Sequence, residues 1–504
     1  MTDNVFGQKR SIFEDIGFKK TIATLCDKIR KLYLSFGAPW IIGYSGGKDS
    51  STVLQLVWLA LSSLPKEQLK YSIHIISTDT LVENPVVAIW VMESLKKMRS
   101  AADKSNLPFY SHRLTPELKD SFWVNLIGKG YPAPRPKFRW CTSRLKINPS
   151  NKFIGNIIEK SGETILALGM RKAESSMRAM SMKSIEEKLG RTQDFLSPNA
   201  SLPNSFVYTP IEDWCDDDVW LFLLENSETP WGTDNNELLD FYKGATKDRE
   251  CPMAITTGTP SCGDSRFGCW VCTMVSQDKS MMAMIQNDEE NKWMKPLLEY
   301  RNSFNIKEDR GRRDFRRMNG KVQLFKGRPI HGPYLEVERQ DLLRKLFEVQ
   351  KLVKSKKPDD VPDFDIISIE ELNEIRKIWN QEKDEIEDRL PIIFEEVFGK
   401  PFPFAQFEES SIYGIDELNI LKGVCGNDTL HYELVRGLIS QEQRYRLMAR
   451  RSGLFDALER TIIKNFYEDE QDASARANYF QKRKKMLQTK PEQLKLEPFI
   501  KPIK

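Results

Sequence analysis

The residues best suited to chemistry lie together near the start of the chain, at Ser45-Gly46-Gly47-Lys48-Asp49-Ser50. Glycines let a backbone approach a phosphate closely, and the free amides at the start of a helix attract anions. Lys48 could reach a phosphate oxygen, and Asp49 could help to hold Mg²⁺. The segment is not a Walker A loop, because three residues rather than four separate Gly43 from Gly47 and an aspartate follows the lysine. We therefore expect a phosphate-binding loop of another type, with an ordinary glycine-rich turn as the alternative.

A second group of reactive residues is a cysteine cluster, since four of the eight cysteines lie between Cys251 and Cys272. Cys269 and Cys272 form a C-x2-C pair, which puts two thiolates within reach of one metal centre, and Cys262 lies upstream. None of the four histidines is near, so an all-thiolate site is expected. One pair with dispersed cysteines favours an iron–sulfur cluster over zinc, which usually has two pairs. The fourth ligand is either Cys251 or Cys141, and the cysteine left over could carry a persulfide.

The segments that must position these residues alternate between two patterns. Apolar runs typical of buried strands occur at 40–44, 71–77, 109–113 and 165–169, and helical periodicity occurs at 12–34, 52–64, 85–97 and 154–160. This alternation predicts an α/β fold whose parallel sheet is covered by helices on both faces. Ligands of such sheets bind at the carboxyl ends of the strands, where the loops after Tyr44 and Leu168 begin.

The length of 504 residues predicts two or three structural units. We expect an N-terminal helical segment at 1–38, a nucleotide-binding domain at 39–240, a cysteine-rich region at 241–283, a charged helical domain at 284–473 and a basic, partly disordered tail at 474–504. The polar stretch 181–204, with two prolines, is expected to be a long loop that acts as a lid or is disordered.

Composition indicates a globular chain, with 40% hydrophobic and 29% charged residues and a net charge of only +4. The N-terminus does not resemble a signal peptide, and the longest apolar stretch, 52–64, is shorter than the roughly 20 residues that span a bilayer. We therefore expect a cytoplasmic protein with no membrane partner. Reduced thiols are expected in that compartment, with Cys26, Cys215 and Cys425 as buried structural residues.

Two later segments contain further candidate residues. Arg171 follows a strand end, where its guanidinium could neutralise a phosphate or sulfate; a surface ion pair with Glu174 is the alternative. Asp79, at the end of the second strand, is a candidate nucleotide contact. The tryptophans at 214 and 220 are expected to be core residues, since aromatic side chains at such spacing usually pack inside.

The loop sequence SGGKDS resembles the signature of the PP-loop ATP pyrophosphatases, which have an adenine nucleotide α-hydrolase-like fold. The segments GMRKAES at 169–175 and TPIEDW at 209–214, followed by DVW at 218–220, resemble the phosphoadenylylsulfate reductase branch, so this resemblance covers roughly residues 40–275. It implies ATP and Mg²⁺ as cofactors, with release of pyrophosphate and transfer of AMP. The catalytic residues implied are Lys48, Asp49 and Arg171, and the nucleotide-binding residues also include Ser45, Gly46, Gly47, Ser50, Asp79 and Gly169.

The segments at 122–147 and 252–274 are similar to the DNA phosphorothioation sulfurtransferases, the C subunits (DndC) of the Dnd system. The resemblance implies that sulfur replaces a non-bridging oxygen of the DNA backbone. It also implies a 4Fe–4S cluster, a cysteine desulfurase as sulfur donor, and two partner subunits, an ATPase and a small DNA-binding protein. Because related proteins carry a cluster ligand at the position of Cys141, the implied ligand set is Cys141, Cys262, Cys269 and Cys272, with Cys251 as the rival fourth ligand.

A basic segment at 301–328 holds ten Lys or Arg against three acidic residues, and it either contacts nucleic acid or forms a solvated helix face. Three other functions remain as alternatives. They are a phosphoadenylylsulfate or adenylylsulfate reductase, a tRNA thiolase, and a nucleotide-sensing iron–sulfur scaffold without turnover. The reductases would be expected to carry a reactive cysteine near the C-terminus, whereas the last cysteine here is Cys425.

Overall fold

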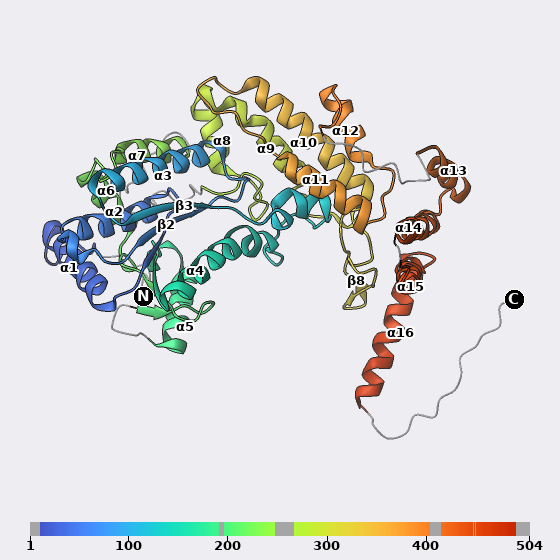
Figure 1. Cartoon of the computed structure of the whole chain (residues 1–504), viewed down its shortest axis with the longest axis horizontal. Helices are drawn as coiled ribbons and strands as arrows, with labels where there is room; N and C mark the ends of the chain where they lie inside the picture. Colours follow the sequence, from blue (N-terminus) through green and yellow to red (C-terminus); the bar gives the residue numbers. More distant parts are fainter. Residues whose placement is uncertain are drawn as a thin grey trace, which may run out of the picture. The chain divides into compact units, whose positions relative to one another are not determined.

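The chain divides into two compact units in a computed structural model that describes residues 11–190, 196–246, 267–403, 415–446, 448 and 450–489 (Figure 1). Unit 1 comprises Met1–Phe122, Ala133–Asn305 and Val349–Ile366. Unit 2 comprises Trp123–Pro132, Ile306–Glu348 and Ile367–Lys504.

Unit 1 is built on a six-stranded sheet with the strand order β3-β2-β1-β4-β6-β5. Five strands run parallel, and β5 at the edge is antiparallel to β6. The strands are β1 (Trp40–Gly43), β2 (Ile73–Thr78), β3 (Phe109–Leu114), β4 (Thr164–Ala167), β5 (Leu196–Pro198) and β6 (Ser205–Tyr208). The first four are the strands predicted from apolar runs, and the α/β class with a mainly parallel sheet is confirmed.

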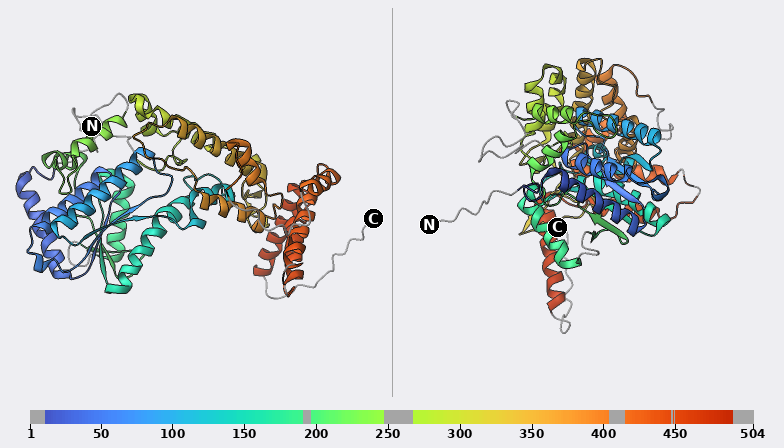
Figure 2. Two further views of the ribbon diagram at one scale, coloured as in Figure 1. Left: turned by 45° about the horizontal axis from the view of Figure 1, so that its top comes forward. Right: turned by 90° about the vertical axis from the view of Figure 1, so that its left-hand side faces the viewer.

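Helices cover both faces of this sheet, as Figures 1 and 2 show. On β1, Trp40 and Ile42 join the core under α1, α2 and α3, whereas Ile41 points the other way and packs with Ile154 of α4. Burial on both faces is why β1 appears in the sequence as a continuous apolar run. The helices of this part are α1 (Phe18–Phe36), α2 (Lys48–Ser62), α3 (Pro85–Ser105), α4 (Asn148–Ser161), α5 (Ser176–Leu189), α6 (Asp216–Glu225) and α7 (Asn235–Gly244).

The prediction of a long loop at 181–204 is wrong in the described part of that stretch. Helix α5 continues to Leu189, and β5 then pairs with β6, which the apolar pattern did not reveal. Pro198 is tolerated in β5 because that strand lies at the sheet edge, where a missing N–H leaves no ladder partner unsatisfied. Residues 191–195 lie outside the described part of the chain.

The remaining helices follow the cysteine region. They are α8 (Lys279–Asn287), α9 (Lys295–Phe304), α10 (Glu336–Lys356), α11 (Ile369–Lys377), α12 (Arg389–Phe398), α13 (Ile415–Cys425), α14 (Thr429–Arg446), α15 (Leu454–Asn465) and α16 (Glu470–Thr489), together with a short hairpin of β7 (Leu324–Phe325) and β8 (Arg328–Pro329). Helix α16 runs through the predicted tail boundary at 474, and charge pairs between neighbouring turns, such as Arg476 with Asp472, stabilise it. None of the helices described is long and apolar enough to cross a bilayer.

Candidate active site

The phosphate loop connects the end of β1 to the start of α2. Gly46 has φ of 76°, and a Cβ on it would lie 2.5 Å from Val91 Cγ2, so this position requires glycine. The Ser50 hydroxyl donates to the Gly47 carbonyl at 2.9 Å and accepts from the Ser45 amide at 3.2 Å. These bonds hold the loop around the first amides of α2, which begins at Lys48 and therefore earlier than predicted. The amides at the start of a helix attract anions, so this turn suits a phosphate.

Lys48 is positioned by two groups from distant parts of unit 1. Its backbone amide donates to the Tyr242 hydroxyl at 3.2 Å, and its ammonium lies 5.4 Å from the centre of the Tyr242 ring. The ammonium also lies 3.4 Å from Asp216 Oδ1. Sequence analysis identified neither partner. The acidic run at the start of α6, Asp216–Asp218, was the available signal for Asp216, whereas nothing local marked Tyr242 on α7.

Arg171 is buried, with 1% of its surface exposed, and its donors point at protein groups. It donates to Asp49 at 2.7 Å, to Asp216 at 2.5 Å and to the Trp214 carbonyl at 3.3 Å. The alternative of a surface pair with Glu174 is wrong, because Glu174 pairs with Arg178. A guanidinium held in this way fixes the position of the Asp49 carboxylate, so Arg171 is a positioning residue in this arrangement.

The carboxylate of Asp216 lies between two cations. Burial by itself would raise the pKa of Asp216, but Lys48 and Arg171 more than offset it and hold that pKa below its usual value. Asp216 in turn helps to keep the buried Arg171 charged, and the pKa of Arg171 is raised despite its burial. The phosphate loop is therefore coupled to the segment after β4 and to the start of α6 through one ion-pair network, Lys48–Asp216–Arg171–Asp49.

The two motifs that resembled the reductase branch pack against each other. The Lys172 amide donates to the Glu212 carbonyl at 2.8 Å, and its ammonium lies 2.8 Å from Asp213. The prediction that Trp214 and Trp220 are core residues is confirmed, because both are buried in the main cluster of unit 1. These motifs thus contain residues that build the site as well as residues that only support it.

Gly169 packs directly against the backbone of the phosphate loop. A Cβ at this position would lie 2.7 Å from the carbonyl carbon and oxygen of Asp49, and 3.0 Å from the Ser50 amide nitrogen. Backbone atoms cannot move aside as a flexible side chain can, so an added methyl must displace the phosphate loop.

Gly169→Ala should therefore weaken ATP binding by about tenfold and lower the free energy of unfolding by about 1–3 kcal/mol. Gly155→Ala in α4 is the matched control, because a Cβ there meets no atom within 4 Å and alanine favours the helix. Nucleotide titration and urea unfolding of both variants test this. Equal nucleotide affinity in the two variants would contradict the close approach.

A pocket of about 80 Å³ adjoins the loop at the carboxyl ends of β1 and β2. Its walls include Ser45, Asp79, Glu83 and Arg113. The Asp79 carboxylate lies 2.5 Å from Arg113 and also accepts from the Leu81 amide at 2.7 Å. Asp79, the predicted nucleotide contact, thus lines the same pocket as the phosphate loop, and Arg113 is a further wall residue that sequence analysis missed.

Cys269 lies beside this pocket, next to the wall residue Glu83. Cys269 Sγ is 3.2 Å from Thr80 Oγ1 and 3.7 Å from Glu83 Oε1, and the Cys272 amide donates to the Cys269 carbonyl at 3.0 Å. Burial first, and then Glu83, raise the pKa of the Cys269 thiol. Burial is also the main cause of the raised pKa of Cys141, and Cys272 adds to it electrostatically. Cys272 thus acts electrostatically on both Cys141 and Cys269.

The predicted cluster site is only partly within the described chain, because Cys251 and Cys262 lie outside it. Among the described residues, no group of three His, Cys, Asp or Glu side chains could hold a metal ion. The donor chemistry at Cys141, Cys269 and Cys272 remains all-thiol, which suits an iron–sulfur cluster. Of the other cysteines, Cys26 is buried as expected, whereas Cys215 and Cys425 are partly exposed.

The basic segment 301–328 is mostly occupied by internal pairing, so it is not a solvated helix face. Only its first residues belong to a regular helix, α9, and the Arg301 guanidinium donates to the carbonyls of Cys272 and Ser276. Arg313 donates to the Gly332 carbonyl, and Arg316 is buried between two carboxylates.

Residues 39–274 match the phosphoadenosine phosphosulfate reductase domain family. An uncharacterized protein of Methanocaldococcus jannaschii is 24% identical over 283 residues, which cover 56% of this chain and 46% of that protein. The chain therefore spans about half the length of this curated relative.

Two solved structures show weak likeness to the chain. One is phosphoadenylyl-sulfate reductase from Candida auris in a phosphate complex, with 12% identity, 44% of this chain and 91% of that chain covered, and a TM-score of 0.25. The other is the U34-tRNA thiolase of Methanococcus maripaludis with its 4Fe–4S cluster, which is 13% identical. That match covers 57% of this chain and 81% of the thiolase chain, and its TM-score is also 0.25. Neither score is high enough to transfer a substrate or a cofactor. The residues that match the family model include the phosphate loop, Arg171 and the Cys269–Cys272 pair.

Proposed function

We propose that the protein is an ATP-dependent sulfurtransferase that joins AMP to a DNA backbone phosphate and then replaces a non-bridging oxygen by sulfur. One observation carries this proposal. Both Ser45 and Glu83 line the pocket beside the phosphate loop, and the Glu83 carboxylate lies 3.7 Å from the Cys269 sulfur. Nucleotide chemistry and thiol chemistry would thus occur at one pocket.

The loop residues have distinct tasks in this proposal. Lys48 and the first amides of α2 would bind the phosphates of ATP that leave as pyrophosphate. Asp49 accepts from Arg171 through Oδ1, and its second oxygen accepts no hydrogen bond from the described residues. That oxygen would bind Mg²⁺, which prefers carboxylate and phosphate oxygens. Arg171 would keep the carboxylate aimed at the metal.

The reaction needs two displacements at phosphorus. A non-bridging oxygen of the DNA phosphodiester attacks the α-phosphorus of ATP, an O–P bond forms, and pyrophosphate leaves. Hydrosulfide then attacks the DNA phosphorus, and AMP leaves with the former phosphodiester oxygen while the proton on sulfur is lost. Joining the oxygen to AMP is necessary because an unactivated phosphodiester oxygen is a poor leaving group.

The cysteines and partners complete the proposal. Cys141, Cys262, Cys269 and Cys272 would hold a 4Fe–4S cluster, with Cys251 as the rival fourth ligand. When bound, the cluster would supply iron as a binding place for sulfur. A cysteine desulfurase would deliver the sulfur as a persulfide, and a second thiol, as the two-electron donor, would release it as hydrosulfide and form a disulfide. An ATPase subunit and a small DNA-binding subunit would assist on the DNA in the cytoplasm.

The direct test uses protein purified without oxygen and divided into two samples. Iron, sulfide and visible absorption are measured in one sample, and AMP and pyrophosphate are measured in the other, with and without DNA. We expect a brown protein that releases AMP and pyrophosphate in equal amounts, faster when DNA is present.

Two results would overturn separate parts of the proposal. Release of ADP and inorganic phosphate would exclude attack at the α-phosphate, and a colourless zinc protein would exclude the cluster. The family match also makes a small-molecule reductase the main alternative. Formation of sulfite from adenylylsulfate or phosphoadenylylsulfate, with no sulfur incorporated into DNA, would favour that alternative.

A further inference from the structure

Unit 2 contains a second charged pocket, which is lined by six basic and five acidic side chains. The pocket lies where the loop after α9, the start of α10, the segment before α12, and helices α14 and α15 meet. Its volume is about 80 Å³, several times the roughly 10–15 Å³ that one water needs. A small oxyanion would therefore fit.

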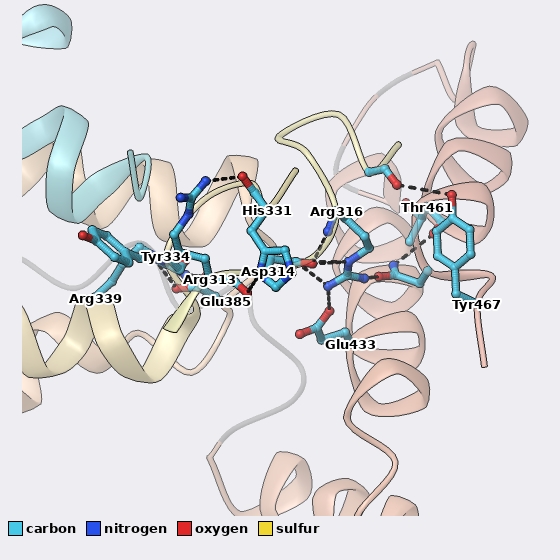
Figure 3. Close-up of polar contacts among 12 residues, drawn as sticks. Arg313, Asp314, Arg316, His331, Tyr334, Arg339, Glu385, Glu433, Thr461 and Tyr467 are labelled. Carbon is cyan, nitrogen blue, oxygen red and sulfur yellow. Dashed lines mark hydrogen bonds and ion pairs between the residues drawn. The ribbon is translucent and has the colours of Figure 1, made fainter. Parts of the chain in front are cut away.

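The carboxylates of this pocket are each paired with an arginine. Asp314 lies 2.7 Å and Glu433 lies 2.6 Å from the same guanidinium, that of Arg316, as Figure 3 shows. Figure 3 also shows Glu385 beside Arg339, its ion-pair partner. Arginines hold the other two carboxylates, in the pairs Glu336–Arg436 and Asp384–Arg444.

Three cations of the pocket remain without a carboxylate partner. Within the described chain, the ammonium groups of Lys383 and Lys464 make no hydrogen bond or ion pair, and Arg317 donates only to the His331 carbonyl, at 3.4 Å. In addition, Arg436 is only 4% exposed, and its buried Nε has no acceptor among the described residues. A buried hydrogen-bond donor without an acceptor lowers the stability of the fold, unless a bound ligand provides the acceptor.

The pKa of Lys383 shows that burial and neighbouring cations outweigh the carboxylates around it. Burial, and then the nearby Arg339 and Lys464, lower the pKa of Lys383, while Glu385 and Asp314 only partly oppose them. The stem of Lys464 packs closely against Gly320, where an added Cβ would lie 2.5 Å from Lys464 Cγ. The ammonium of Lys464 is close enough to that of Lys383 to lower its pKa electrostatically.

We propose that this pocket binds an oxyanion of the phosphate class through Lys383, Lys464 and Arg317. The ligand is either a free phosphate or sulfate ion or a phosphate of nucleic acid, because both present the same negative oxygens. This site would be separate from the phosphate loop of unit 1 and would not depend on the proposed sulfur transfer.

Calorimetric titration of the full chain with inorganic phosphate, at constant ionic strength against chloride, tests the proposal. The test variant is Lys383→Gln with Lys464→Gln, and the control is Lys377→Gln, an exposed lysine of α11 outside the pocket. We expect the double variant to lose one class of phosphate sites or to weaken it by at least about tenfold. The phosphate loop has the same sequence in the double variant and in the control, so phosphate that binds there contributes equally to both titrations.

Equal phosphate binding in the double variant and the control would overturn the proposal. Circular dichroism and melting show whether each variant is folded, and Lys464→Arg, which keeps both stem and charge, should retain binding. A loss in Lys464→Arg as large as in the double variant would assign the effect to packing and would also overturn the proposal.

A parallel titration with a DNA duplex identifies the source of the oxyanion. Weaker DNA binding by the double variant, with phosphate as a competitor, identifies nucleic acid. Unchanged DNA binding together with lost phosphate binding identifies a free ion.

Discussion

Asp49→Ala should reduce pyrophosphate release by about 100-fold or more and abolish phosphorothioate in DNA, the order of loss expected when one group that stabilises a charged transition state is removed. The carboxylate lies at the start of α2, and Arg171 fixes it at 2.7 Å. Its removal takes away the oxygen proposed to bind Mg²⁺ and leaves the phosphate charge without that metal. Pyrophosphate is measured in steady state, and sulfur in DNA is measured by mass spectrometry of nuclease digests.

The matched control is Asp103→Ala, which removes an exposed carboxylate from α3 of the same unit and should leave both readouts unchanged. Melting temperatures are compared so that unfolding is not mistaken for lost chemistry. Full DNA modification by a folded Asp49→Ala protein would remove the phosphate loop from the proposed reaction.

Arg171→Met should lower the free energy of unfolding by about 3 kcal/mol, the lower end of the range for breaking a buried ion pair. Methionine fills similar space but leaves Asp49 and Asp216 without their shared cation. The lower end applies because the Asp49 and Asp216 side chains are 24% and 29% exposed, so water can solvate the carboxylates after the guanidinium is removed. Pyrophosphate release should fall as well, since nothing then fixes Asp49. Urea unfolding and the pyrophosphate assay measure the two effects.

Lys172→Met tests the specificity of this effect at the next residue. The Lys172 side chain is 38% exposed and pairs with Glu212 and Asp213 at the surface, so its loss should cost no more than about 1 kcal/mol. Adding Asp49→Asn to Arg171→Met should recover part of the stability, because Asp216 still has Lys48 beside it whereas Asp49 has no other cation partner among the described residues. If Arg171→Met and Lys172→Met unfold at the same urea concentration, the buried network contributes no more to stability than the exposed ion pairs of Lys172.

Local sequence determined the framework of unit 1. The apolar runs at β1, β2, β3 and β4 predicted the strands, because a strand buried on both faces must be apolar along its whole length. The loop Ser45–Ser50 could be recognised for the same kind of reason, since glycines and a helix start are local requirements of phosphate binding. Two short strands were missed, β5 at the sheet edge and its neighbour β6.

Only the tertiary structure decided the partners of the charged residues. Arg171 meets Asp216 across 45 positions of sequence, and Lys48 meets Tyr242 across 194. In unit 2, Arg316 pairs with Glu433 across 117 positions, so a segment that looked like a free basic surface is largely internal. Charge is visible in a sequence, but whether a charge faces solvent, a ligand or a buried partner depends on which distant segments the fold brings beside it. Strand and loop patterns depend on near neighbours, and for that reason the sequence alone was sufficient for them.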